Sequence, residues 1–201
     1  MKISCMKGKL MQGISNVSKA VSTKTTHPIL SCIFIEAENG NIKLTANDME
    51  IGIESYVEGT VIEEGKVAIE AKLLSDIVRK LPDSEIHMET NEDFKTTIKC
   101  EKSLFTIAGK SGEDFSSLPV VEKSKFITIS QFTLREIINQ TIFSISDSEY
   151  NNVMTGELFE VSNNRLRVVA IDGHRIAIRN VELKNESEDV KVIVPGKALS
   201  Y

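Results

Sequence analysis

The amino-acid sequence predicts an α+β protein made of repeated domains, each with two helices packed on a largely antiparallel sheet. Three observations support this prediction: an internal repeat, two apolar stretches with helical spacing, and a series of short strand-like runs joined by turn signals. Hydrophobic residues make up 41% of the 201 residues and charged residues 26%, which is typical of a globular protein.

The repeat relates two segments that lie 124 residues apart. The run ILSCIFIEAENGNIKLTANDMEIGI begins at Ile29, and the similar run VMTGELFEVSNNRLRVVAIDGHRIAI begins at Val153. Identical pairs at this offset are Glu36 and Glu160, Asn39 and Asn163, Ala46 and Ala170, and Asp48 and Asp172. Further on, KVAIEAKLLS from Lys66 matches KVIVPGKALS from Lys191. The second copy is therefore expected to gain one residue near Gly173.

The repeat length gives the expected domain boundaries. The first domain is predicted to span residues 1–124 and the second residues 125–201. Because Ser200 matches Ser75, the second copy is expected to be incomplete, without its second helix and later strands. An incomplete copy leaves an apolar face and a sheet edge uncovered.

The elements of the first copy follow from its periodicity, beginning with a short strand at residues 2–6. Leu10, Ile14, Val17 and Val21 then recur at helical spacing and give one apolar face. Short strands are predicted at 33–35, 42–44 and 51–53, and Asn39-Gly40 favours a hairpin between the first two. A second helix at 73–81 ends before Pro82, and strands at 85–90, 95–100 and 103–108 follow.

The charge is segregated along the chain, although the net charge is −5. Residues 1–35 contain five lysines and no acidic residue, and the second predicted helix carries Lys72, Arg79 and Lys80 against Asp76 alone. The predicted helices are therefore basic, while the strands and turns hold most of the acids. This distribution suits loose contact between helices and phosphates, although ordinary solvated helix faces account for it equally well.

Cofactor and membrane signals are weak. Cys5, Cys32 and Cys100 are far apart, odd in number and without a Cys/His cluster, so we expect buried thiols and neither a metal site nor a cofactor. The N-terminus resembles neither a signal nor a transit peptide, and no apolar run could span a membrane. A cytoplasmic protein is the expectation.

Sequence motifs of catalysis are equally weak, because the common nucleophile, phosphate-loop and metalloprotease motifs do not occur. The only suggestive group is Asp172-Gly173-His174-Arg175, in which an aspartate could orient an imidazole. A turn is the better interpretation, because the matching place in the first copy, Asp48-Met49-Glu50, keeps the aspartate and lacks the histidine. We therefore predict a structural aspartate and a protein that is not an enzyme.

The chain resembles a known family at several of these segments. HPIL at 27–30, LTANDMEIGI from Leu44, LFEVSNNRLRVVAIDGHRIAI from Leu158 and VIVPGK from Val192 are similar to the bacterial DNA polymerase III beta subunit, the DNA sliding clamp. The resemblance covers the chain from its first residue to its last and implies the N-terminal domain and part of the middle domain, with the third domain absent.

The resemblance implies the DNA clamp fold and a homodimeric ring around duplex DNA, with helices lining the hole and sheets outside. The ring would tether the replicative polymerase for processive synthesis without reading sequence. The implied partners are DNA, the polymerase III catalytic subunit, the clamp loader and repair proteins that carry short peptide motifs. The alternative is a stand-alone module that binds such peptides without encircling DNA.

The resemblance also implies site residues. By position, the DNA-binding residues are Lys24, Arg79, Lys80 and Lys197. The matching positions of a partner-peptide pocket are Met154, Ile171, Gly173, His174, Arg175 and Ile176. Without the resemblance, core packing would be the favoured interpretation of the apolar members, Met154, Ile171 and Ile176. One departure is Asn151-Asn152, where relatives often carry Arg-Pro.

Overall fold

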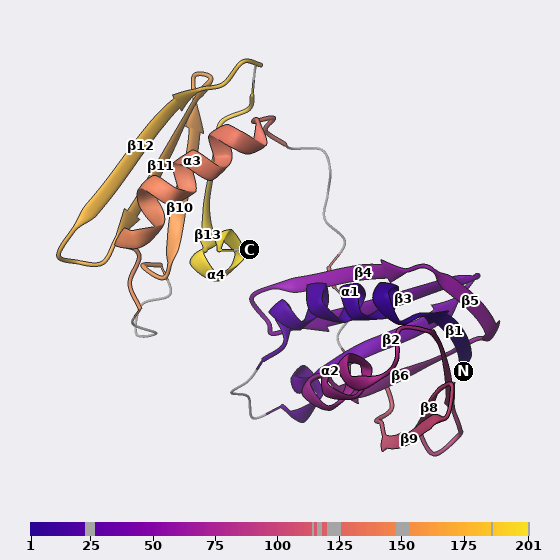
Figure 1. Cartoon of the computed structure of the whole chain (residues 1–201). Helices are drawn as coiled ribbons and strands as arrows, with labels where there is room; N and C mark the ends of the chain where they lie inside the picture. The colour runs from indigo at the N-terminus through magenta and orange to yellow at the C-terminus, as the bar shows by residue number, and fades with distance from the viewer. Residues whose placement is uncertain are drawn as a thin grey trace. The chain divides into compact units, whose positions relative to one another are not determined.

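The computed structural model describes residues 1–22, 27–113, 115, 118–119, 126–147, 153–185 and 187–200. The chain divides into two compact units, Met1–Pro119 and Val120–Tyr201 (Figure 1). Residues 124 and 125, where the sequence predicts the domain boundary, lie outside the described residues.

The first unit contains two antiparallel sheets and two α-helices. The five-stranded sheet has the order β5 (Gly59–Glu63), β1 (Lys2–Met6), β7 (Glu85–Thr90), β8 (Lys95–Cys100) and β9 (Ser103–Ala108). The four-stranded sheet has the order β4 (Gly52–Val57), β3 (Asn41–Asn47), β2 (Cys32–Glu38) and β6 (Gly65–Glu70). The α+β class is confirmed, but the unit has two sheets where the sequence predicted one.

The helices α1 (Lys7–Val17) and α2 (Ala71–Lys80) pack against each other and against the sheets. Helix α1 buries Leu10, Gly13, Ile14 and Val17. A Cβ at Gly13 would lie 2.6 Å from a Val57 methyl group, so glycine permits the close approach of helix and strand. Glu70 caps the start of helix α2, because its carboxylate accepts a hydrogen bond from Leu73 N at 3.2 Å, and the helix ends before Pro82.

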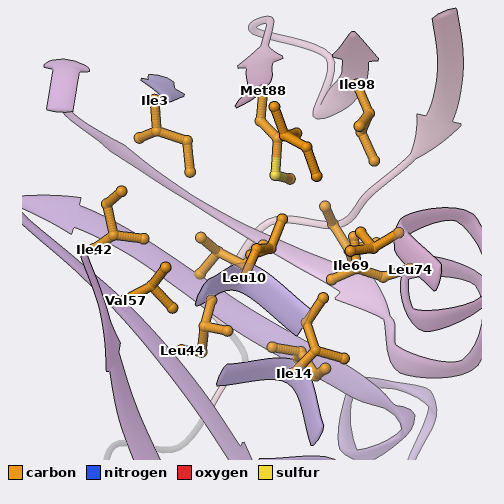
Figure 2. Packing of buried hydrophobic residues seen from close by; sticks show 14 of the residues in the cluster. Ile3, Leu10, Ile14, Ile42, Leu44, Val57, Ile69, Leu74, Met88 and Ile98 are labelled. Carbon is orange, nitrogen blue, oxygen red and sulfur yellow. The ribbon is translucent and has the colours of Figure 1, made fainter. Parts of the chain in front are cut away.

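Both sheets and both helices enclose one hydrophobic core (Figure 2). The largest fully buried side chains include Ile3 and Met88 from one sheet, Ile42 and Leu44 from the other, and Leu10 of α1. Each strand contributes alternate residues, as expected where one face of a sheet is buried. The helices therefore cover the inner face of the sheets, and the opposite faces carry the more exposed residues except where Phe115 packs on Phe34.

Two-residue turns join the matching hairpins of the two units. Asn39 and Gly40, between β2 and β3, have φ of 52° and 74°. Asn163 and Asn164 occupy the equivalent turn with φ of 51° and 58°. Positive φ at both central positions identifies turns that match the twist of antiparallel strands. The predicted hairpin at Asn39-Gly40 is confirmed.

The second unit repeats part of the first. Helix α3 (Gln131–Thr141) and the short helix η3 (Ile142–Ser144) precede a sheet with the order β12 (Ile176–Glu182), β11 (Arg165–Ile171), β10 (Gly156–Ser162) and β13 (Val190–Pro195). The four-residue helix α4 (Gly196–Leu199) follows. No α-helix in the described part of the chain is long and apolar enough to cross a membrane.

The strand register corrects one detail of the repeat. Asn47 pairs with Gly52 in the first unit, and Ile171 pairs with Ile176 in the second, so the offset of 124 holds through the turn at Gly173. In contrast, Glu70 pairs with Cys32 and Pro195 pairs with Gly156, which requires an offset of 125 on β13. The prediction of an extra residue near Gly173 is wrong, because that residue lies between β12 and β13.

Candidate functional site

The first candidate surface is the exposed face of α1 and α2. Arg79 and Lys80, two of the predicted DNA-binding residues, are both exposed on the last turn of α2. Their position is favourable for the helix, because cations stabilise the negative end of a helix dipole. Lys9 and Lys19 on the neighbouring segment and Lys72 on α2 are also exposed. The basic helix face expected from the sequence is therefore present in the first unit.

Acidic neighbours reduce the charge of this face at two points. Arg79 Nη2 lies 2.6 Å from Asp76 Oδ1 on the preceding turn, and Lys9 Nζ lies 2.8 Å from Glu58 Oε2. Such exposed pairs are weak and exchange easily with water or another anion. The face therefore keeps a net positive charge without a rigid anion-binding geometry.

The remaining predicted DNA-binding residues are placed differently. Lys197 lies in the first turn of α4 in the second unit and is half-buried. Lys24 and the departure at Asn151-Asn152 lie outside the described residues. Only Arg79 and Lys80 are brought together on one element.

The second candidate surface is the turn between β11 and β12, where Asp172 organises the chain. Its Oδ1 accepts hydrogen bonds from the main-chain nitrogens of His174 at 2.9 Å and Arg175 at 3.0 Å. Its Oδ2 accepts one from Arg175 Nε at 2.7 Å. The His174 N–H, with the Arg175 N–H and guanidinium, holds the pKa of Asp172 below its usual value.

The first unit contains the same turn. Asp48 Oδ1 accepts hydrogen bonds from Glu50 N at 3.0 Å and Ile51 N at 2.8 Å, and Asp48 N donates to Ile51 O. The prediction that the aspartate is structural is confirmed in both units. Because both oxygens of Asp172 bind main-chain or guanidinium donors, this carboxylate is committed to the turn. An Asp172–His174 catalytic pair therefore gains no support.

Five of the six predicted pocket residues belong to this turn or its two flanking strand ends. Ile171 and Ile176 face each other across β11 and β12 and are 38% and 57% exposed, although neighbouring Ala170 and Ala177 are buried. Gly173, His174 and Arg175 lie in the turn itself and are exposed. Met154 is half-buried on the turn before β10, and its carbonyl accepts a hydrogen bond from Ser146 N.

The exposure of Ile171 and Ile176 argues against core packing for these two residues. The residues directed to the core of this unit are Leu166, Val168 and Ala170 on β11 and Ala177 on β12. An apolar pair on the opposite face is available to a partner. Gly173 has φ of 89°, and a Cβ there would meet no atom within 4 Å. The turn conformation alone accounts for this glycine.

Two features were missed by reasoning from the sequence. Phe143 in η3 is 57% exposed, and the Arg175 guanidinium lies 5.9 Å from its ring centroid. In the first unit, the edge strand β9 exposes Leu104 (63%) and Phe105 (40%). The sequence shows that the predicted strand at 103–108 carries these two apolar residues. It does not show that this strand lies at the edge of a sheet.

Groups of three or more metal-ligating side chains are not found among the described residues. The three cysteines are buried and unpaired, as predicted. Burial raises the pKa of the Cys5 thiol to about 11 and also raises the pKa of Cys32 and Cys100.

Comparisons with known proteins agree with this architecture. Residues 1–119 match the family model of the DNA polymerase III beta subunit N-terminal domain, and residues 128–201 match the central domain. A beta sliding clamp of Halalkalibacterium halodurans is 36% identical over 94% of this chain and 53% of its own length. The beta sliding clamp of Bacillus subtilis is 34% identical over 100% of this chain and 55% of its own length.

Solved structures show the same similarity. The crystal structure of a putative DNA polymerase III beta subunit from Eubacterium rectale has a TM-score of 0.94 and 56% identity, over 100% of this chain and 54% of that one. The sliding clamp of Bacillus subtilis has a TM-score of 0.93 and 32% identity, over 100% and 55%. The chain thus spans about half the length of its relatives. It has the clamp fold and belongs to the DNA polymerase III beta subunit family, matching the family's N-terminal and central domains.

Proposed function

We propose that this chain is part of a sliding clamp that encircles duplex DNA and tethers the replicative polymerase. The observation that carries the proposal is the exposed basic face of α1 and α2, which lies opposite the outer faces of two sheets in the first unit. Cations on flexible side chains bind phosphates without reading the bases, so a ring lined by such helices can slide.

The edge strand β9 supports ring closure between two subunits. Its exposed Leu104 and Phe105 lie beside main-chain groups that have no neighbouring strand among the described residues. Such an edge favours pairing with a strand of another chain. In a head-to-tail homodimer, the complementary edge would come from another part of the partner subunit.

The turn at Asp172 is the proposed docking point for peptide motifs of the polymerase III catalytic subunit, the clamp loader and repair proteins. Ile171 and Ile176 offer an apolar anchor, and the adjacent Arg175 and His174 offer polar contacts. The clamp performs no catalysis in this proposal, since its work is topological and depends on binding.

The DNA-binding step is tested by reversing charge on α2. In a subunit of the length of its relatives, we expect Arg79→Glu with Lys80→Glu to weaken retention on nicked circular DNA at least tenfold. Two lost phosphate contacts should also reduce the slope of log K against log salt by roughly 2. The matched control is Lys95→Glu with Lys99→Glu, exposed on the outer face of β8. Equal loss in both double variants would contradict the proposal.

The second candidate function is a stand-alone peptide-binding module, favoured by the exposed pair Ile171 and Ile176, which needs no ring to bind a peptide. Sequencing the encoding gene beyond the Tyr201 codon tests it first. A reading frame that continues through another domain and a half supports the ring, and an immediate stop codon supports the module.

Peptide binding itself is tested with fluorescein-labelled peptides that tile the same organism's polymerase III catalytic subunit. Ile176→Asp is expected to weaken the binding of the responsive peptide about tenfold or more, as loss of an interface anchor does. Ile62→Asp is the matched control, because Ile62 is also 57% exposed but lies on β5 of the first unit. Unchanged affinity in the Ile176 variant would contradict docking at this turn.

A further inference from the structure

The outer face of the first unit's four-stranded sheet carries a cavity that the proposed clamp function does not use. Its volume is about 610 Å³, within the size range of ligand sites. Phe34 on β2 and Thr45 on β3 line it from the sheet, and Phe115 and Leu118 line it from the segment after β9. Phe115 stacks on Phe34 with ring centroids 5.0 Å apart. The cavity is therefore built from two parts of the first unit that pack together.

Thr45 gives this cavity an unused hydrogen-bonding group. The residue is only 3% exposed, and its Oγ1 has no hydrogen-bond partner among the described residues. The strand register places Thr45 between Phe34 and Glu54 on the same face. An unpartnered buried hydroxyl costs free energy, which a bound group regains if it forms a hydrogen bond there. Rotation of χ1 between staggered positions can direct Oγ1 towards such a group.

A network of ion pairs borders the cavity on the same face of the sheet. Lys43 Nζ lies 2.7 Å from Glu36 Oε2 and 3.5 Å from Glu54 Oε1. Lys66 Nζ lies 3.2 Å from Glu36 Oε1 and 3.1 Å from Glu38 Oε1. Three carboxylates thus share two lysines, and both lysines are bound to Glu36. The network therefore has an excess of negative charge, which is carried by Glu54 and Glu38.

Two further residues strengthen the attraction for a cation. Glu113 lines the cavity, is exposed and has no ion pair among the residues that the structure describes. Tyr56 is 69% exposed and lines a smaller cavity of about 170 Å³, which shares Glu36 and Lys43 with the first. Arginine suits such a place, because its guanidinium stacks on aromatic rings and pairs with carboxylates.

Strand geometry sets the spacing between the hydroxyl and the place for a cation. Thr45 and Lys43 lie two residues apart on β3, and Glu54 and Tyr56 lie two residues apart on β4. Such residues point to one face of a sheet and are about 6–7 Å apart. Side chains two positions apart on an extended peptide have the same spacing. A segment that lies along these strands can therefore place one side chain over Thr45 and the next but one beside Tyr56.

We propose that this face of the first unit binds an extended segment of a partner protein with a tyrosine and, two positions later, an arginine. The tyrosine ring occupies the cavity, and its hydroxyl forms a hydrogen bond with Thr45 Oγ1. The arginine stacks on Tyr56 and pairs with Glu54. The site belongs to the first unit and is independent of the peptide docking proposed at the turn of Asp172.

Titration with a synthetic peptide, acetyl-Gly-Ser-Tyr-Ser-Arg-Ser-Gly-amide, tests the proposal on the 201-residue chain. We expect saturable shifts of the NMR signals of Thr45, Tyr56 and Leu118. Phenylalanine in place of the peptide's tyrosine should weaken binding about fivefold, because the Thr45 hydroxyl then stays unpartnered. Glutamate in place of its arginine should weaken binding roughly tenfold or more, because it meets an excess of carboxylates.

Variants of the protein assign these preferences to single groups. Thr45→Val keeps nearly the same shape without the hydroxyl and should bind the tyrosine and phenylalanine peptides equally. Thr97→Val, half-buried on β8 of the other sheet, is the matched control and should retain the preference for tyrosine. Glu54→Gln should reduce the preference for arginine over glutamate about fivefold, since one carboxylate is lost.

Three results would overturn the proposal. The first is the absence of shifts at Thr45 and Tyr56 up to the solubility limit of the peptide. The second is a preference for tyrosine that persists in Thr45→Val. The third is binding of N-acetyl-tyrosinamide as tightly as the peptide, because a small phenol and not a protein segment would then be the occupant.

Discussion

At the scale of single residues, the turn after Asp48 shows what its counterpart after Asp172 requires. Met49 adopts φ of 77°, a left-handed conformation that side chains other than glycine and asparagine rarely adopt, and Gly173 holds the equivalent position with φ of 89°. Met49 is 74% exposed, so little packing compensates for its strain. The same backbone geometry is thus imposed by the aspartate in both units.

We therefore expect Met49→Gly to stabilise the protein by up to about 1 kcal/mol, since relief of left-handed strain exceeds the entropy cost of glycine. Gly173→Ala should destabilise the second unit by a similar amount. Urea denaturation followed by circular dichroism measures both changes. A decrease in stability for Met49→Gly would show that the methionine side chain contributes more than its exposure indicates.

Glu157 is a second residue whose role emerges only from the structure. It is fully buried on β10, at the position where the first unit has the core residue Ile33. Thr141 Oγ1 lies 2.8 Å from both Glu157 Oε1 and the Ile137 carbonyl, and Oε2 has no partner among the described residues. Burial raises the pKa of Glu157, which favours the protonated carboxyl.

This raised pKa predicts a pH dependence of stability. The folded state holds the proton to a higher pH than the unfolded state, so stability falls as pH rises from the ordinary glutamate range towards the folded pKa. The urea midpoint of Glu157→Gln should equal that of the parent protein near pH 4.5 and should be higher than that of the parent protein at pH 8. Glu182→Gln, at an exposed site, is the control. A constant difference between parent and Glu157→Gln across this range would refute the interpretation.

The buried cysteines predict low thiol reactivity. Burial disfavours the thiolate, which is the reactive form, and raises the pKa of Cys5 to about 11. Native protein should react with Ellman's reagent at least a hundredfold more slowly than protein in denaturing urea, where three thiols per chain should titrate. Rapid native reaction of one thiol would indicate local opening of its sheet.

At the scale of elements, strand β12 explains where sequence reasoning succeeded and failed. The pattern Ile176-Ala177-Ile178 predicts a strand, and the strand is present. If these isoleucines are matched to Ile51 and Ile53, the second copy needs an inserted residue. The strand register instead turns the Ala177 side chain towards the core and both isoleucine side chains away from it. Hydrophobicity alone does not reveal which face of a two-sided strand is covered.

The helices and turns were more predictable because their signals are local. Asn39-Gly40, Pro82 and the spacing of Leu10 and Ile14 identified a hairpin, a helix end and a buried helix face. The separation of strands into two sheets was not predictable, since β5 pairs with β1 across more than fifty residues. Such pairings depend on the tertiary fold and leave little trace in periodicity.

The edge strand β9 yields a prediction about assembly. In a subunit of the length of its relatives, Leu104→Lys should weaken subunit association roughly 10- to 100-fold, because a charge replaces an exposed apolar contact on the edge. Sedimentation equilibrium measures the effect. Ile62→Lys, on the opposite edge strand β5, is the control and should leave association unchanged. Loss of association in the control alone would move the interface to β5.

At the scale of the whole molecule, predicted site residues gather at two places. Arg79 and Lys80 lie together because α2 carries both, and the turn at Asp172 gathers Gly173, His174 and Arg175. The family resemblance located both groups. The aspartate turn could also be predicted from the sequence itself, because Asp48 and Asp172 match in the internal repeat. The exposure of Ile171 has no such signal, since it depends on what lies over the sheet.

The matching turns and strand registers of the two units also bear on the order of folding during synthesis. Strands β2–β4 and β10–β12 share lengths and pairings so closely that one set could pair with the other in a nascent chain. The main core cluster of the first unit lies within residues 1–108. At about 5–20 residues per second, the ribosome needs several seconds to add the second unit. This interval lets the first set of strands close before its near-copy emerges, which protects the tandem units from exchanging strands.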